Sequence, residues 1–150
     1  MNPLMIDRIR IVICLLLLLA EGIWDKRTKR IRIIPLAVAL PVGIILSFLQ
    51  GKEDGIYSLF GMIPGLLFLG IAVATKEKVG YGDGLVILVT GALLGLKINL
   101  VMVLIGLFLA ALTAVWLLIR KRAGGKTKMA FVPFLLPALT LSLMMTGGGK

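Results

Sequence analysis

Long apolar runs separated by short polar segments dominate this sequence. They lie at about residues 9–24, 31–49, 56–74, 84–98, 100–119 and 129–145. Most of them approach the roughly 20 residues that a helix needs to cross a bilayer. Because lipid offers the backbone no hydrogen-bond partners, each run is predicted to form a helix that satisfies its own amides. The pattern therefore predicts an all-α membrane protein.

The run at 84–98 determines how many spans to expect. Its apolar centre, residues 85–96, is short enough to be a re-entrant segment, or it extends through Ile98 as a full span. With six spans, one side of the membrane receives twelve of the 17 Lys and Arg residues and the other side five. A re-entrant segment would spoil this asymmetry. Because basic loops favour the cytoplasmic side, we expect a bundle of six transmembrane helices with both termini non-cytoplasmic, forming one domain over residues 1–150.

Small residues and prolines refine the expected packing. Gly61 and Gly65, and again Gly91 and Gly95, are four residues apart. This spacing places each pair on one helix face and permits close helix approach. Prolines inside the runs predict kinks that neighbouring helices can tolerate.

Composition agrees with a membrane protein, at 59% hydrophobic and 16% charged residues. The net charge of +10 suggests nucleic acid in a soluble chain, but here the basic residues cluster between apolar runs, which indicates membrane topology. The apolar stretch at 11–20 follows Arg8 and Arg10 like a signal peptide. Glu21 and Asp25 follow it instead of a small-residue cleavage pattern, so we expect a retained span.

The residue inventory restricts the possible chemistry. The chain has no histidine, which excludes His-metal sites and Ser-His-Asp catalysis. Cys14 is the only cysteine, so neither an internal disulfide nor a cysteine zinc site can form. Catalysis would fall on carboxylates, lysines or hydroxyls, and we expect neither a metal nor a cofactor.

Three of the seven carboxylates stand out by position. Four are expected to be solvated charges at the outer ends or in loops: Asp7, Glu53, Asp54 and Glu77. Asp25 ends the first span and Asp83 begins the fourth, both on the predicted cytoplasmic side. Glu21 lies one helical turn before Asp25 on the same face. An ionisable group at membrane depth is a functional candidate, although Glu21 also fits a structural role as partner to a basic residue or a backbone donor.

Asp83 lies within the glycine-rich segment Gly80-Tyr81-Gly82-Asp83-Gly84. Glycine permits backbone conformations and close approaches that a side chain would block. An aspartate here also fits an ordinary helix N-cap, just as Asp25 fits a loop charge beside basic residues.

Together these segments resemble the prepilin peptidase, or type IV leader peptidase, family of GxGD intramembrane aspartic proteases. Asp25 followed by basic residues and Ile34-Pro35 is similar to the family's first element. Gly80-Tyr81-Gly82-Asp83 is similar to its GxGD element, and Val132-Pro133-Phe134 to the entry into its last span. The chain departs from the family at Leu85, often basic there, and at Leu36, often asparagine.

The resemblance implies an aspartic endopeptidase with Asp25 and Asp83 as catalytic residues. It makes Gly80, Gly82, Glu21, Pro133 and Phe134 candidate supporting residues. The implied substrate is a prepilin or pilin-like precursor with a short basic leader, cleaved at the cytoplasmic face of a prokaryotic plasma membrane. Nothing in the chain could supply the methyltransferase region of bifunctional members, so we expect peptidase activity only.

Three alternatives use the same residues differently. Pro137-Ala138-Leu139 matches the PAL triplet of signal-peptide-peptidase-type GxGD proteases. A small transporter could use Glu21, Asp25 and Asp83 as a proton relay. The departure at Leu85 fits a non-catalytic assembly subunit built on the peptidase fold.

Overall fold

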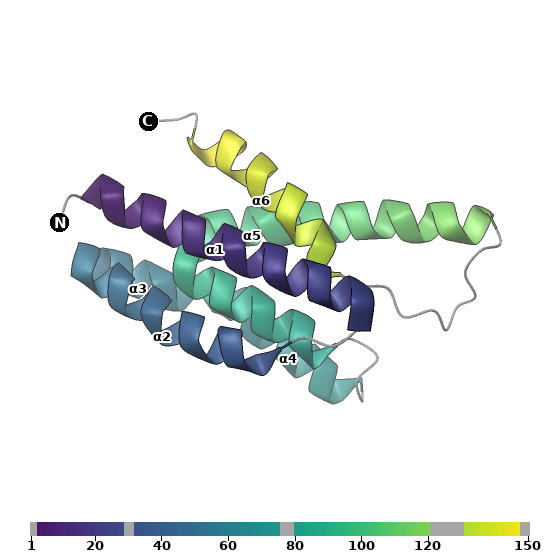
Figure 1. Ribbon diagram of the computed structural model, residues 1–150, viewed down its shortest axis with the longest axis horizontal. Helices are drawn as coiled ribbons and strands as arrows, with labels where there is room; N and C mark the ends of the chain where they lie inside the picture. The colour runs from purple at the N-terminus through teal and green to yellow at the C-terminus, as the bar shows by residue number, and fades with distance from the viewer. Residues whose placement is uncertain (1–2, 29–31, 76–79, 121–130, 148–150) are drawn as a thin grey trace.

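The computed structural model describes residues 3–28, 32–75, 80–120 and 131–147. Over these ranges the chain is helical and contains no strand, as predicted. The helices are α1 (Pro3–Thr28), α2 (Ile33–Gln50), α3 (Lys52–Gly61), α4 (Ile63–Ala74), α5 (Tyr81–Ile119) and α6 (Val132–Gly147). Figure 1 shows them side by side in one bundle.

Three helical segments are long and apolar enough to cross a membrane: Ile33–Gln50, Lys52–Ala74 and Tyr81–Ile119. In α1, Arg10 and Glu21 leave only residues 11–20 free of charge between them. Large apolar side chains are exposed along the helices, as expected where lipid rather than water surrounds them. The chain is thus a helical membrane protein, and the number of six spans and the placement of the termini remain predictions.

The longest helix, α5, reverses direction at Gly95. Gly95 has φ 75° and ψ 175°, a conformation that glycine adopts at little cost. The side-chain amide of Asn99 donates to the carbonyl of Ile87 over 3.1 Å. In a straight helix these residues would be about 18 Å apart, since each residue adds about 1.5 Å. Figure 1 shows the two halves of α5 running in opposite directions, teal and then green. The turn precedes the boundary expected near residues 98–100.

The single apolar run predicted at 56–74 forms two helices. α3 ends at Gly61 and α4 begins at Ile63, with Met62 between them. Pro64 occupies the first turn of α4, where its missing N–H is tolerated. The break leaves helix-end carbonyls that need partners from elsewhere in the bundle.

The glycine pairs bring α3 and α4 against the first half of α5, which agrees with the close helix approach expected from their spacing. A methyl group added at Gly61 would meet the backbone of Gly91 and Gly95, and one at Gly65 would meet the backbone of Leu88. These groups cannot move aside as a flexible side chain could. Glycine at these positions is therefore a requirement of close backbone packing.

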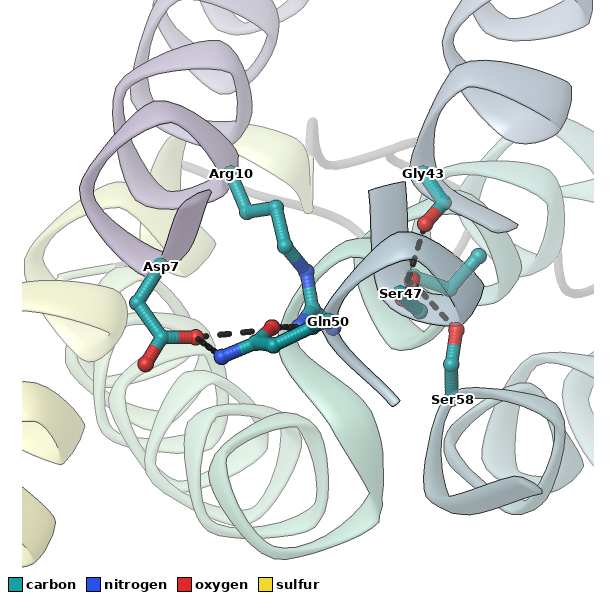
Figure 2. A network of polar contacts seen from close by, with 7 residues as sticks. Asp7, Arg10, Gly43, Ser47, Gln50 and Ser58 are labelled. Atoms are coloured by element: carbon teal, nitrogen blue, oxygen red, sulfur yellow. Dashed lines mark hydrogen bonds and ion pairs between the residues drawn. The ribbon is translucent and has the colours of Figure 1, made fainter. Parts of the chain in front are cut away.

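Polar side chains supply partners for the backbone groups freed by the breaks. The amide of Asn99, which is fully buried, donates to the carbonyl of Gly61 over 2.8 Å. The hydroxyls of Ser47 and Ser58 donate to the carbonyl of Ala92, three residues before the reversal in α5. In Figure 2 these two serines approach each other from neighbouring helices. The interior thus stabilises its helix breaks through side-chain hydrogen bonds.

A second polar group joins α1 to α2 at the opposite end of α1 from Asp25. Arg10, which is 7% exposed, donates to Gln50 Oε1 over 2.7 Å, and Gln50 Nε2 donates to Asp7 Oδ1 over 2.9 Å. Figure 2 shows the three side chains meeting where α2 ends. Asp7, expected to be a solvated charge, is instead half exposed and takes part in this contact.

Candidate functional site

Four helix ends meet around the candidate carboxylates. Asp25 lies in the last turn of α1, and Asp83 lies in the first turn of α5. The two are close enough that the charge of Asp25 acts on Asp83. The start of α2 contacts the same end of α1 through Glu21, and the start of α6 contacts it through Asp25. Helix N-termini carry partial positive charge, so this end of the bundle favours carboxylates.

Asp25 is buried and held by the start of α6. It is 6% exposed, and it accepts a hydrogen bond from the backbone N–H of Val132, the first residue of α6. Its Oδ2 atom is buried without a hydrogen-bond partner. A buried carboxylate oxygen that lacks a partner is costly, so this atom has free capacity for a water molecule or a ligand group.

Asp83 is positioned by the glycines around it. The backbone N–H of Asp83 donates to the carbonyl of Gly80 over 3.2 Å, and a methyl group at Gly80 would lie 3.1 Å from Asp83 Oδ2. A side chain at residue 80 would therefore press on the carboxylate. Gly84 packs against the side chain and the backbone N of Leu69 in α4. Gly82 is the second residue of α5 and is partly buried.

Glu21 and Trp24 connect α1 to the beginning of α2. Glu21 is 2% exposed, and its Oε2 accepts a hydrogen bond from the backbone N–H of Arg32 over 3.0 Å. The guanidinium of Arg32 lies 3.5 Å from the centre of the Trp24 ring. Of the two roles that the sequence left open for Glu21, the structural one as acceptor for a backbone donor is observed.

The third element of the resemblance lies beside Asp25. Pro133 approaches Gly22 of α1, where an added methyl group would lie 3.7 Å from Pro133 Cα. The backbone N–H of Phe134 donates to the carbonyl of Phe131 over 2.9 Å, and the ring of Phe131 stacks on that of Phe68 in α4. These contacts fix the start of α6, and hence the N–H group that reaches Asp25.

Several sequence predictions have other outcomes. Leu36, where the resembling family often has asparagine, is buried in the hydrophobic core, and Leu85 packs against that core. Ala138 and Leu139 of the PAL triplet are also fully buried core residues. Of the basic clusters expected at 26–32 and 120–128, residues 29–31 and 121–128 lie outside the described residues. Among the residues that the structure describes, no three His, Cys, Asp or Glu side chains are grouped to hold a metal ion.

Three features of the site were not found by sequence reasoning. The N–H of Val132 and that of Arg32 are backbone groups, which sequence patterns do not identify. Gly22 was not singled out, because an isolated glycine in an apolar run gives no signal of its own.

The fold and the site define a helical membrane protein with paired carboxylates at one end of its bundle. The sequence matches the type IV leader peptidase family over residues 11–115, about two thirds of the chain, and the protein belongs to that family. This match includes Glu21, Asp25 and Asp83, whereas α6 lies beyond it. Family membership implies a leader-peptidase-like protease that acts on a precursor protein. Neither the curated proteins nor the solved structures give a match.

Proposed function

We propose that this protein is an aspartic endopeptidase that removes the short basic leader of a prepilin or pilin-like precursor. The observation that supports this most directly is the placement of Asp25 near Asp83, with Oδ2 of Asp25 buried and unpartnered. Membership of the leader peptidase family supports the reaction class. The proposal includes peptidase activity without methyltransferase activity and needs no metal or cofactor.

The reaction follows from the chemistry of paired carboxylates. Two neighbouring carboxylates cannot both ionise cheaply, so they share one proton. The ionised member removes a proton from water as the water attacks the scissile carbonyl, and the protonated member polarises that carbonyl. The proton taken from the water then passes to the leaving amine as the C–N bond breaks, and the pair again holds one proton. Because such a pair titrates as a unit, Asp25 and Asp83 are not assigned separate roles.

The substrate class agrees with where the carboxylates lie. Both belong to turns at the ends of apolar helices, which supports a position at the membrane edge. A precursor with a basic leader and a following hydrophobic helix would present its cleavage site at that depth. The excess of Lys and Arg expected on the same side supports a cytoplasmic location for this edge, and the proposed substrate class corresponds to a prokaryotic plasma membrane.

The test is cleavage of a precursor in cells. The wild-type chain is co-expressed with prepilins from its own source, beside Asp25→Asn and Asp83→Asn, and leader removal is measured by mass spectrometry. Both variants should lose cleavage at normal protein levels. Asp54→Asn is the matched control, because Asp54 is exposed in the first turn of α3. Normal cleavage by both variants would contradict the proposal, as would a wild type that cleaves no precursor.

The same variants separate the alternatives. A proton-relay transporter would show altered transport in the Asp25 and Asp83 variants with every precursor left intact. A non-catalytic subunit would leave both cleavage and transport unchanged. A signal-peptide-peptidase-type enzyme would cut within a membrane-spanning signal sequence, rather than at the boundary between a basic leader and its helix.

A further inference from the structure

Glu21 is the most deeply buried carboxylate among the residues that the structure describes. It is 2% exposed in a helix whose neighbouring residues are mostly apolar. A carboxylate in such surroundings is retained only where it is bonded or functional. Its hydrogen bond from the N–H of Arg32 provides one such reason. Arg32 is the N-cap residue of α2, and no side chain of its own caps that helix.

The contact with Arg32 has a second part nearer to Asp25. Trp24 is three residues after Glu21 on the same helix face, and its ring carries the guanidinium of Arg32. Arg32, the N-cap residue of α2, thus contacts α1 twice: Glu21 binds its backbone N–H, and the Trp24 ring contacts its guanidinium. Asp25 immediately follows Trp24 in the sequence.

Asp25 itself accepts a hydrogen bond from the N–H of Val132 at the start of α6. The end of α1 is therefore in contact with two helix starts, that of α2 and that of α6. Its rotation and its depth relative to Asp83 depend on both. Catalytic groups lose on the order of 10²-fold in rate when displaced by about 1 Å.

We propose that Glu21 is a positioning residue: by accepting the N–H of Arg32, it fixes the start of α2 against α1 and holds Asp25 in register with Asp83. This inference rests on the proposed peptidase function. Glu21 acts here as a hydrogen-bond acceptor and neither donates nor relays a proton. The side-chain oxygen of a glutamine accepts a hydrogen bond in the same place. Glu21→Gln should therefore keep the cleavage activity that Glu21→Leu loses.

Cleavage kinetics of the purified full-length protein test the inference. Glu21→Leu should lower kcat on the order of 10²-fold with little change in KM, and Glu21→Gln should recover most of that loss. Arg32→Pro removes the donor together with the contact between the guanidinium and Trp24, so it should lose at least as much activity as Glu21→Leu. The substitution fits the backbone, since φ of Arg32 is −81°, close to the proline value. Arg32→Ala keeps the N–H and should lower kcat less. The Glu21→Leu and Arg32→Pro losses should not add in the double variant.

Gln50→Leu is the matched control, because it breaks a contact between the same two helices far from Asp25. It should lower thermal stability and leave kcat of the folded protein unchanged. The inference is overturned if Glu21→Gln is as inactive as Glu21→Leu, or if the losses in the double variant add. A Glu21→Leu variant that cleaves normally would overturn it as well.

A fluorescence measurement tests the contact without cleavage. The chain has two tryptophans, so Trp116→Phe leaves Trp24 as the only one. In that background Glu21→Leu should increase the acrylamide quenching of Trp24, and Glu21→Gln should leave it unchanged. If the wild type cleaves no precursor, the proposed function fails. The fluorescence measurement still decides whether Glu21 holds Arg32. Unchanged quenching in Glu21→Leu would overturn the inference.

Discussion

Polar groups are buried in two regions of this molecule, and their hydrogen bonding differs. Between α3, α4 and α5, the amide of Asn99 and the hydroxyls of Thr90 and Ser58 all have partners, which include backbone carbonyls near the helix breaks. At the end of α1, Oδ2 of Asp25 is buried with none. Among the described residues, the only other buried side-chain N or O atom without a partner is Nε of Arg10, at the far end of α1.

The difference agrees with the catalytic role proposed for Asp25. A polar group away from water costs free energy unless it is bonded, and a fold under no other demand satisfies such groups, as the interior does. Asp25 keeps one oxygen free although glycines and helix starts around it are closely fitted. A hydrogen-bond acceptor without a partner, in otherwise closely packed surroundings, is what a site needs to bind water and substrate. It costs some stability.

The largest expected effect concerns the interior. Gly91→Ala places a methyl group against the carbonyl of Gly61 and the amide of Asn99, and should cost on the order of 3 kcal/mol of stability. Thermal unfolding in detergent measures this. Gly70→Ala is the matched control, because no atom lies within 4 Å of the position its methyl group would take. Equal stability of the two variants would contradict the close packing described for α3 and α5.

A second pair of substitutions contrasts the two regions directly. Asn99→Leu leaves the buried carbonyl of Gly61 without its donor and should lower stability by about 2 kcal/mol. Asp25→Asn removes the charge of a carboxylate with a free oxygen, so stability should stay the same or rise while cleavage is lost. Unfolding and cleavage assays on the same preparations provide the check. A loss of stability in Asp25→Asn as large as that in Asn99→Leu would remove the contrast.

The smallest effect tests how α6 holds Asp25. Gly22→Ala should be tolerated, since its methyl group would make an ordinary contact with Pro133. Gly22→Leu should push the start of α6 away, weaken the bond from Val132 to Asp25, and slow cleavage about tenfold. The rate ratio between the two variants, measured at equal amounts of folded protein, is the relevant quantity. A ratio near one would show that the position of α6 does not matter to Asp25.

Much of the helical arrangement was predictable because lipid imposes a simple rule. An apolar run in a bilayer must form a helix, so run lengths translate into α2 and both halves of α5, whereas the single run expected at 56–74 divides into α3 and α4. The charge pattern likewise placed Asp25 and Asp83 at one end, where the structure has them. Glycine spacing predicted close helix approach at Gly61, Gly65, Gly91 and Gly95, because small residues permit it, but not that α3 and α4 would contact α5.

The rest depends on contacts that no local pattern contains. A boundary was expected near residues 98–100, between the runs at 84–98 and 100–119, but Gly95 adopts the backbone conformation that turns the chain. Asn99 then packs back against Ile87. The hold on Asp25 comes from a backbone N–H more than a hundred residues away. Backbone donors have no sequence signature, so the partners of Asp25 and Glu21 required a structure.

The reversal of α5 also has a consequence for how the chain reaches its folded state. Its two halves contact each other through residues only nine to twelve positions apart in sequence, as Thr90 and Ile87 meet Asn99. Contacts of such short separation form at small entropic cost. We therefore expect this helical hairpin to assemble early during biogenesis. It would then present Gly91 as a template on which α3 and α4, synthesised before it, find their place.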